Sequence, residues 1–450
     1  MNFFQRLDGV FNLCHVRQHT CDAVRPTIRR VWVIAKTKEI LRERPKITVS
    51  ELRDWLKDRH AVDVDMTIAS LALRDVKTDP LQGAVSFGHL ASFLEALRSN
   101  DERTRTSLSC DGGLFKPAFL ALGMCVTAFP HTTRVIGLDA CHIKDRYGGA
   151  LLVMTVLDGN GNVFPAALGI AESENVETWF WFLALVKTAF QIGLGEGLVV
   201  LGDREKGLDA ALKALLQSAA HSYCVYHIEK NVKCTFHTSL DGLLFRAAKA
   251  SNQRMFNEVL NQIKALDPAA GRYIEEIEKA KWARAFFPMR RFGHVTSNIS
   301  ESMNWWFEEA RHLNPVALFI VYIRRLNQLF ERRRIKYASM APTDLPRKVS
   351  KKFAKCLEQS RKLRVLRHTN TLFEVQSLKD PRQFRIVDFE RRTCSCGFFT
   401  EHGIPCRHMC AAALSVKMHP KTFIIRERTR EALTQTYTGV TIPIDIGTLT

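Results

Sequence analysis

The residues best suited to chemistry in this chain form a cysteine and histidine cluster in its C-terminal part. Cys394 and Cys396 are one residue apart, and after nine further residues Cys406 and His408 are again one residue apart. Three thiolates and one imidazole complete the tetrahedral coordination of a structural zinc site, and they leave no position open for a substrate. The spacing therefore predicts a structural Zn²⁺ ion.

A second candidate centre consists of two aspartates that each end a short apolar run. Asp139 ends the run RVIGLD, and Asp203 ends the run LVVLGD. The carboxyl ends of strands in an α/β sheet form the edge where ligands bind, so neighbouring strands would bring these side chains together. Two carboxylates can hold Mg²⁺, and paired metal ions can activate water against a phosphodiester. An aspartate after a strand is also common in turns and caps, so this interpretation stays open.

The segments around these aspartates have the pattern of a mixed α/β sheet. The expected strands are residues 134–139, 150–157, 163–170, 198–203 and 223–226, and the expected helices are residues 176–190 and 206–217. Asp158-Gly159-Asn160-Gly161 is a hairpin turn signal between the second and third strands. From about residue 228 to residue 312 the pattern is helical.

The N-terminal part has the pattern of three short helices between residues 31 and 80, with a capping box at Thr48 and Glu51. Such a triple is typical of a helix-turn-helix unit that binds DNA, although any small three-helix bundle has the same pattern. The third helix offers only Arg74 and Lys77 as candidate DNA contacts.

The overall charge favours a polyanionic partner. The 450 residues contain 65 Lys and Arg against 46 Asp and Glu, a net charge of +19. No uncharged apolar run reaches the roughly 18 residues that a membrane span needs, so nucleic acid is the favoured partner. We expect an intracellular protein, in which the 12 cysteines stay reduced and are available for metal binding. His402 and Cys410 are spare ligand candidates, and Cys410 is more simply a small buried residue.

The surplus charge is concentrated between Arg324 and Arg367, a stretch that contains fifteen Lys and Arg but only three acids. Apolar residues at helical spacing accompany them, so we expect basic helices that pack on a core. A solvated helix face is the simpler alternative to a surface that contacts DNA phosphates. The candidate DNA contacts here are Arg324, Arg325, Arg332, Arg333, Arg334 and Lys336.

Several motifs occur in an order that resembles the transposase domain of Mutator-like element (MULE) DNA transposons. They are the LD motif at Asp139, the DREKGL motif at Asp203, the CVYH motif from Cys224 to His227, and the NISESMN motif around Glu301. The resemblance implies an RNase H-like core with a catalytic Asp-Asp-Glu triad of Asp139, Asp203 and Glu301 that holds Mg²⁺ or Mn²⁺. It also implies that Cys224 and His227 shape the active site or touch DNA, whereas burial in the core is the alternative.

The C-terminal cysteine cluster similarly resembles a SWIM zinc finger, which follows the catalytic core in this family. His19 and Cys21 resemble the last two ligands of the zinc ribbon that precedes the family's helix-turn-helix. Only Cys14 lies upstream of them, so we expect a truncated remnant of that ribbon within residues 1–30.

The resemblance implies the following organisation: a ribbon remnant at 1–30, a helix-turn-helix-like region at 31–80, an RNase H-like domain at 130–312 with a helical insertion at about 228–295, a basic helical region at 313–380, and a SWIM finger at 385–420. The leading hypothesis is a nuclear transposase that cleaves and joins DNA. It would bind terminal inverted repeats and target DNA as a homo-oligomer. The alternative is a domesticated, transposase-derived transcriptional regulator without catalytic activity. A non-transposing RNase H-like nuclease is disfavoured by the helical insertion and the N-terminal helices.

Overall fold

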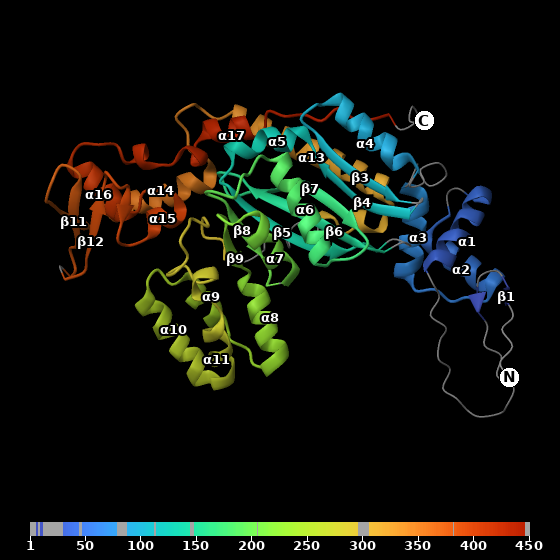
Figure 1. Cartoon of the computed structure of the whole chain (residues 1–450), viewed down its shortest axis with the longest axis horizontal. Coiled ribbons are helices and arrows are strands. Elements are labelled where there is room, and N and C mark those ends of the chain that lie inside the picture. The colour runs from blue at the N-terminus through green and yellow to red at the C-terminus, as the bar shows by residue number, and fades with distance from the viewer. Residues whose placement is uncertain are drawn as a thin grey trace. The chain divides into compact units, whose positions relative to one another are not determined.

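The computed structural model describes residues 6–7, 10–11, 30–44, 47–78, 88–111, 114–144, 148–204, 206–295, 306–380 and 382–445. The chain divides into two compact units, Met1–Ser86 and Phe87–Thr450, whose elements are labelled in Figure 1. The candidate ribbon residues Cys14, His19 and Cys21 lie outside the described residues. Among the described residues, no helix is long and apolar enough to cross a membrane.

The first unit contains the three helices that the sequence predicts, α1 (Arg30–Glu43), α2 (Val49–His60) and α3 (Met66–Thr78), beside the short strands β1 (Arg6–Leu7) and β2 (Val10–Phe11). The predicted capping box starts α2, because Thr48 accepts the backbone N–H of Glu51 and the Glu51 carboxylate accepts the N–H of Thr48 at 2.7 Å. The helices share an apolar core made of Val33, Ile40, Ile47, Leu52, Leu56, Val64, Ala69, Ala72 and Leu73.

A seven-stranded mixed sheet organises the second unit. Its strands are β3 (Arg105–Asp111), β4 (Leu114–Ala121), β5 (Val135–His142), β6 (Ala150–Leu157), β7 (Val163–Ala171), β8 (Val199–Gly202) and β9 (Ala220–Tyr223). Their order is β3-β4-β7-β6-β5-β8-β9. The strands β5, β8 and β9 are parallel, and the other pairs are antiparallel.

Two details of this sheet differ from the sequence prediction. The strands β3 and β4 are additional to the predicted ones. The fifth predicted strand, residues 223–226, was wrong in position: β9 ends at Tyr223, and residues from Val225 on are helical. Its sequence AHSY is mostly polar, as suits a strand at the end of the described sheet, so apolar patterning does not reveal it.

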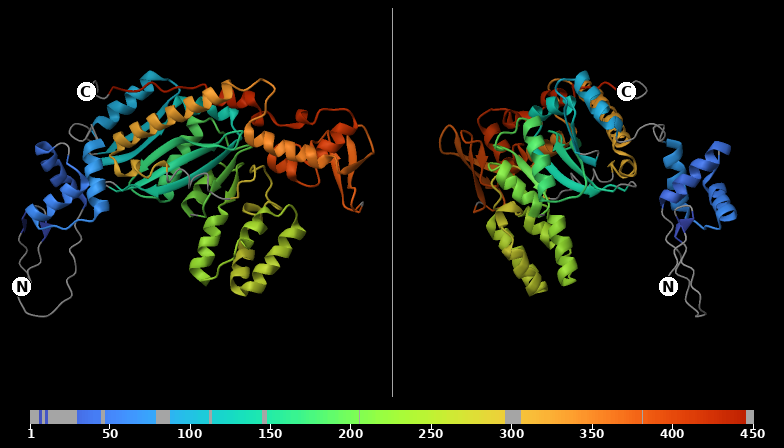
Figure 2. Two further views of the ribbon diagram at one scale, coloured as in Figure 1. Left: turned by 180° about the vertical axis from the view of Figure 1, so that it is seen from behind. Right: turned by 45° about the vertical axis from the view of Figure 1, so that its right-hand side comes forward.

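Helices cover both faces of the sheet, which explains why β6 is buried along its whole length. Figures 1 and 2 show α6 (Val176–Ala189) on one face and α13 (Pro315–Ala338) on the other. The ring of Phe182 on α6 lies against Gly169 of β7. On the opposite face, the ring of Phe330 on α13 lies 5.2 Å from that of Phe164. The helix α7 (Lys206–Leu215) packs beside α6, and α4 (Gly88–Asn100) and α5 (Gly123–Ala128) complete this part.

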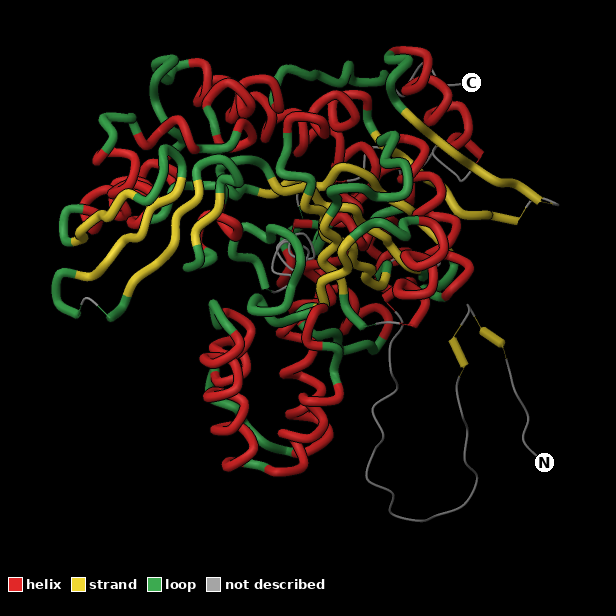
Figure 3. The backbone as a smooth tube through the Cα atoms, turned by 60° about the vertical axis from the view of Figure 1, so that its left-hand side comes forward, coloured by secondary structure: helices red, strands yellow, loops and turns green. Residues whose placement is uncertain are grey.

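The predicted helical insertion follows β9 and consists of α8 (Val225–Phe236), α9 (Leu243–Lys249), α10 (Gln253–Leu266) and α11 (Pro268–Glu276). These helices, drawn red in Figure 3, share an apolar core of their own around Ile228, Leu244, Phe256, Ile263 and Trp282. Beyond α11 the chain to Val295 has one short 3-10 helix, Lys279–Lys281, and otherwise irregular structure instead of the expected helix.

The C-terminal part contains a four-stranded antiparallel sheet, β10 (Leu363–Arg367), β11 (Leu372–Ser377), β12 (Phe384–Asp388) and β13 (Thr393–Cys394). The helices here are α14 (Arg347–Ser360), α15 (Phe398–His402), α16 (Arg407–Ser415) and α17 (Arg430–Thr436). The expectation that residues 313–380 are helical therefore holds only as far as Ser360. Beyond Ser360 the chain forms strands. In β11 the buried residues Phe373 and Val375 alternate with more exposed ones, which is the two-residue period of a strand.

The end of the described chain returns to the predicted hairpin turn between β6 and β7. Asp158 is buried there and accepts the hydroxyl of Tyr437 at 2.7 Å. Arg428 donates to the carbonyl oxygen of Gly159 at 2.8 Å. A Cβ atom on Gly159 would lie 1.5 Å from the carbonyl oxygen of Glu427, so only glycine permits this contact. The turn is thus a docking point for the C-terminal segment.

Candidate functional site

Asp139 and Asp203 lie at the same level on neighbouring strands. The parallel register pairs Gly137 of β5 with Leu201 of β8, and each aspartate lies two residues further along the chain. Adjacent strands are about 4.8 Å apart, so the sheet brings together two half-buried carboxyl groups that are far apart in the sequence.

The two aspartates differ in how their strands end. Asp203 follows β8 directly, as predicted, whereas β5 continues to His142, three residues past Asp139. The extension stays paired with β6 through His142 and Ala150, while β8 has already ended at Gly202. Asp139 therefore lies where β5 loses its parallel neighbour, which is where ligands bind to such sheets.

Cys224 and His227 join the aspartates at this sheet edge. The N–H of Cys224 donates to the carbonyl oxygen of Gly202 at 2.8 Å, one residue before Asp203, and Cys224 is the N-cap residue of α8. A hydrogen bond to Cys224 raises the pKa of His227, with additional effects from the charges of Asp203 and Asp139. Four of the predicted site residues are thus neighbours.

The third predicted carboxylate, Glu301, lies in residues 296–305, outside the described residues. The chain on both sides of this gap reaches the same sheet edge. The carbonyl oxygen of Val295 accepts the N–H of Val225, the first residue of α8. After the gap, the carbonyl oxygen of Arg311 accepts the N–H of Lys144 at 2.7 Å, two residues beyond β5.

Arg311 is a cation of this edge that the sequence analysis did not single out. Its guanidinium donates to the carbonyl oxygen of His142 and pairs with Glu308. Burial raises the pKa of the neighbouring Cys141 to about 11, against the opposing charge of Arg311. No sequence signal marks Arg311, because only the folded chain brings it next to the end of β5, which is far away in the sequence.

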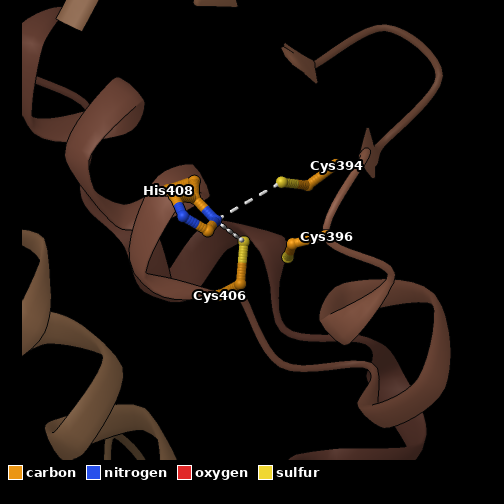
Figure 4. A group of neighbouring side chains, drawn as sticks. All are labelled: Cys394, Cys396, Cys406 and His408. Carbon is orange, nitrogen blue, oxygen red and sulfur yellow. Dashed lines mark hydrogen bonds between the residues drawn. The ribbon is translucent and has the colours of Figure 1, made fainter. Parts of the chain in front are cut away.

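The predicted zinc ligands Cys394, Cys396, Cys406 and His408 come together in the C-terminal part, and Figure 4 shows them facing one another. Their ligand atoms all lie within 4.8 Å of one another. The Nδ1 atom of His408 is 3.7 Å from the sulfur of Cys394 and 3.8 Å from that of Cys406. Tetrahedral zinc with its usual bond lengths separates a sulfur and a nitrogen ligand by about 3.6 Å, so the cluster fits the ion.

Local structure prepares these thiols for a metal. Cys406 caps α16 and accepts the N–H of Met409 at 3.4 Å, and a helix N-terminus favours a thiolate. Hydrogen bonds from Cys394 and Cys406 lower the pKa of Cys396, so the crowded thiols favour one thiolate even before metal binding. The set has four protein ligands and therefore the composition of a structural site.

The two spare candidates lie outside this ligand set. His402 packs against Phe398 with ring centroids 4.5 Å apart, and burial lowers its pKa to about 3. Cys410 is buried, and burial raises its pKa to about 12. Cys410 is therefore a small buried residue, as its simpler interpretation has it, and the Nδ1 atom of His402 lies 3.3 Å from the Nζ atom of Lys352.

The candidate DNA contacts on α13 have unequal surroundings. Arg333 donates to the Tyr437 hydroxyl at 2.8 Å and to the Val163 carbonyl at 3.1 Å. Arg334 donates to the carbonyls of Tyr437 and Gly439, and Arg325 pairs with Glu309 at 2.7 Å. These three serve contacts within the protein. The exposed ones are Arg324, Arg332 and Lys336.

The earlier candidates Arg74 and Lys77 belong to α3 of the first unit. Their side chains lie outside what the structure describes. Their contact with DNA stays a prediction.

Comparison with known families gives two matches. Residues 135–231 match the family model of the MULE transposase domain, and residues 373–417 match that of the SWIM zinc finger. No curated protein matches the chain. The first match includes Asp139, Asp203, Cys224 and His227, and the second includes the four residues of the zinc cluster. The resemblance drawn from the sequence motifs is therefore confirmed for these two segments.

Proposed function

With a MULE transposase domain and a SWIM zinc finger as the premise, we propose that this chain is a DNA transposase that cleaves terminal inverted repeats and transfers the strand ends to target DNA. The observation that carries the proposal is the shared register of Asp139 and Asp203 inside the matched domain. We propose Glu301 as the third carboxylate of the catalytic triad. The described chain reaches the same sheet edge on both sides of its segment, which supports that assignment.

The strand order supports an RNase H-like core. Three antiparallel strands, β7, β6 and β5, adjoin the two parallel strands β8 and β9. The helical insertion begins directly after the last of these strands. Asp139 lies on β5, the third of these five strands, and Asp203 directly follows β8, its parallel neighbour, as the proposed chemistry needs.

The donor set suits a hard divalent cation, because Asp139 and Asp203 offer carboxylate oxygens, the ligands that Mg²⁺ and Mn²⁺ prefer. Bound there, the ions would supply an activated water or 3′-hydroxyl and would stabilise the leaving oxygen of the phosphodiester. A hydrogen bond to Cys224 and the charges of Asp203 and Asp139 raise the pKa of His227, which favours its protonated form, and that form would offer positive charge to a DNA phosphate.

Other parts of the proposal concern partners. The Cys₃His cluster supports structural Zn²⁺ in the finger, and the transposase domain implies DNA binding. We propose in addition that the protein acts in the nucleus and forms a homo-oligomer on paired transposon ends.

Asp203→Asn tests the proposal. The variant keeps the size of the side chain and one acceptor oxygen but removes a charged metal ligand. Cleavage of a labelled transposon end with Mg²⁺ should fall at least about 1,000-fold, since loss of several kcal/mol of transition-state stabilisation is expected. Asp241→Asn, in an exposed loop of the helical insertion, is the matched control and should cleave normally.

Two outcomes would contradict the proposal in different ways. Full cleavage by Asp203→Asn would exclude the triad assignment. Specific binding of the inverted repeats without any cleavage by the unmodified protein would instead indicate the transcriptional regulator.

A further inference from the structure

The zinc finger holds a segment of the chain that leads to the carboxylate site. The short helix α15 lies between the ligands Cys396 and Cys406, and Glu401 on it is only 5% exposed. Its side-chain Oε1 accepts the N–H of Gly293 at 2.7 Å, and its carbonyl oxygen accepts the N–H of Phe292 at 3.1 Å. One residue of the finger thus binds two consecutive amides of the segment.

Arginines of the same segment bind other carbonyl groups of the finger. Arg284 donates to the carbonyl oxygen of Gly397 at 3.0 Å, directly after the ligand Cys396. The Nε atom of Arg284 also lies 3.8 Å from the Glu401 carboxylate. Arg290 donates to the carbonyl oxygen of Thr400 at 2.7 Å. The stretch between the zinc ligands is therefore the surface on which residues 284–293 are docked.

The far side of this segment contacts the sheet edge that carries the candidate catalytic residues. Arg291 is fully buried and donates to the Ser222 hydroxyl on β9 at 3.0 Å. The carbonyl oxygen of Val295 accepts the N–H of Val225 at 3.0 Å. Ser222 and Val225 flank the region of Cys224, whose N–H is bonded to Gly202 beside Asp203.

We propose that Glu401 is a positioning residue through which the zinc-loaded finger orders residues 284–295 and, with them, the junction of β9 and α8 at the carboxylate site. The catalytic part of this inference rests on the proposed transposase function. Zinc fixes both ends of the stretch from Cys396 to Cys406. Without it, a helix of five residues has too few hydrogen bonds to persist, and Glu401 loses its fixed place.

Glu401 is suited to this role because its charge is nearly enclosed. A buried carboxylate is stable only with hydrogen bonds and opposite charge, and here the Gly293 amide and Arg284 supply both. Its removal leaves the Gly293 N–H without its acceptor and Arg284 without its ion-pair partner, so the segment should open more often.

Amide hydrogen exchange of the full-length chain tests the inference. In Glu401→Ala, amides of residues 287–295 should exchange at least about 10-fold faster than in the unmodified protein, the effect of losing one buried hydrogen bond and one ion pair. Residues 220–228 should show a smaller increase. Zinc content should stay at one ion per chain. Glu390→Ala is the matched control, because Glu390 is an exposed acid of the same finger.

Zinc removal supplies the second arm. A chelator should accelerate exchange of residues 287–295 more in the unmodified protein than in Glu401→Ala, where the side-chain bond to Gly293 is already lost. Glu401→Gln, which keeps an acceptor oxygen for Gly293, should restore most of the protection. If the protein cleaves DNA, Glu401→Ala should lower kcat about 10-fold and leave KM for DNA nearly unchanged.

The exchange result decides the inference even if the chain has no cleavage activity, so its failure is distinct from failure of the proposed function. Unchanged exchange at residues 287–295 in Glu401→Ala would overturn the inference. Loss of zinc from both Glu401→Ala and Glu401→Gln would also overturn it, because the residue would then serve the finger itself.

Discussion

The zinc cluster and the carboxylate site differ in how far apart along the chain their residues lie. The four zinc ligands fall between residues 394 and 408, whereas Asp139 and Asp203 have 63 residues between them. The end of β13, the short helix α15 and the start of α16 are enough to assemble the cluster, which a bound zinc ion would then stabilise. The carboxylates meet only after three antiparallel strands and a crossover helix are in place. Damage to the sheet should therefore affect one site and spare the other.

The largest expected effect comes from breaking the cluster. Cys406→Ala removes a ligand and the cap of α16, so the finger should lose its zinc and unfold. Structural zinc sites contribute about 10 kcal/mol or more to folding, which no local packing replaces. Zinc content and proteolysis of residues 385–420 measure the loss. Asp139→Asn should keep its full zinc content, and zinc loss in that variant would show that the cluster depends on the carboxylate site.

A smaller but still severe effect should follow from Gly159→Ala. The added Cβ would overlap the carbonyl oxygen of Glu427, and neither backbone can move far, because Asp158 and Tyr437 are bonded beside it. We expect the free energy of unfolding of the sheet part to fall by about 3 kcal/mol. Thermal denaturation measures this change, while zinc content serves as the control. A melting temperature within about 1 °C of the unmodified protein would show that the turn does not anchor the C-terminal segment.

The two sites also differ in how much of each could be predicted from the sequence. Closely spaced ligands were predictable, because Cys and His one residue apart reach one ion in almost any turn. Asp203 was predictable as a strand-end acid, whereas Asp139 lies inside β5, three residues before its end, and the parallel register explains why the two meet. The role of Glu401 was not predictable, because the residue looks like an ordinary surface acid until residues 292 and 293 lie against it. Similarly, Arg333 was indistinguishable from Arg332 in sequence, although Tyr437, more than 100 residues away, binds only one of the two through its hydroxyl.

A more moderate effect is expected at Asp209, whose side chain connects α7 to β9 next to the carboxylate site. It lies on α7, shortly after Asp203, and a hydrogen bond to His221 on β9 lowers its pKa well below the usual 3.8, with further contributions from Lys213 and Lys281. A lowered pKa in the folded state means that the ionised group stabilises the fold above about pH 4 and that this contribution is lost as the pH falls further. Asp209→Asn should therefore be about 2 kcal/mol less stable at pH 7.

The difference between Asp209→Asn and the unmodified protein should shrink as the pH falls below about 4. Urea denaturation at several pH values measures it. A difference that is constant from pH 7 to pH 3 would show that the side chain acts by shape and not by charge.

The smallest expected effect distinguishes exposed from engaged cations on one helix. Arg332 and Lys336 are exposed on α13, so Gln at both positions should weaken binding to any DNA sequence and reduce the slope of log affinity against log salt by about 0.9 for each lost phosphate contact. Arg333→Gln is the matched control, because it should change stability through Tyr437 and Val163 and leave the salt slope unaltered. Equal slopes for the unmodified protein, the double Gln variant and Arg333→Gln would mean that Arg332 and Lys336 lie on a solvated helix face and do not contact DNA phosphates. A slope that changes only in Arg333→Gln would mean that the Tyr437 contact opens when DNA binds.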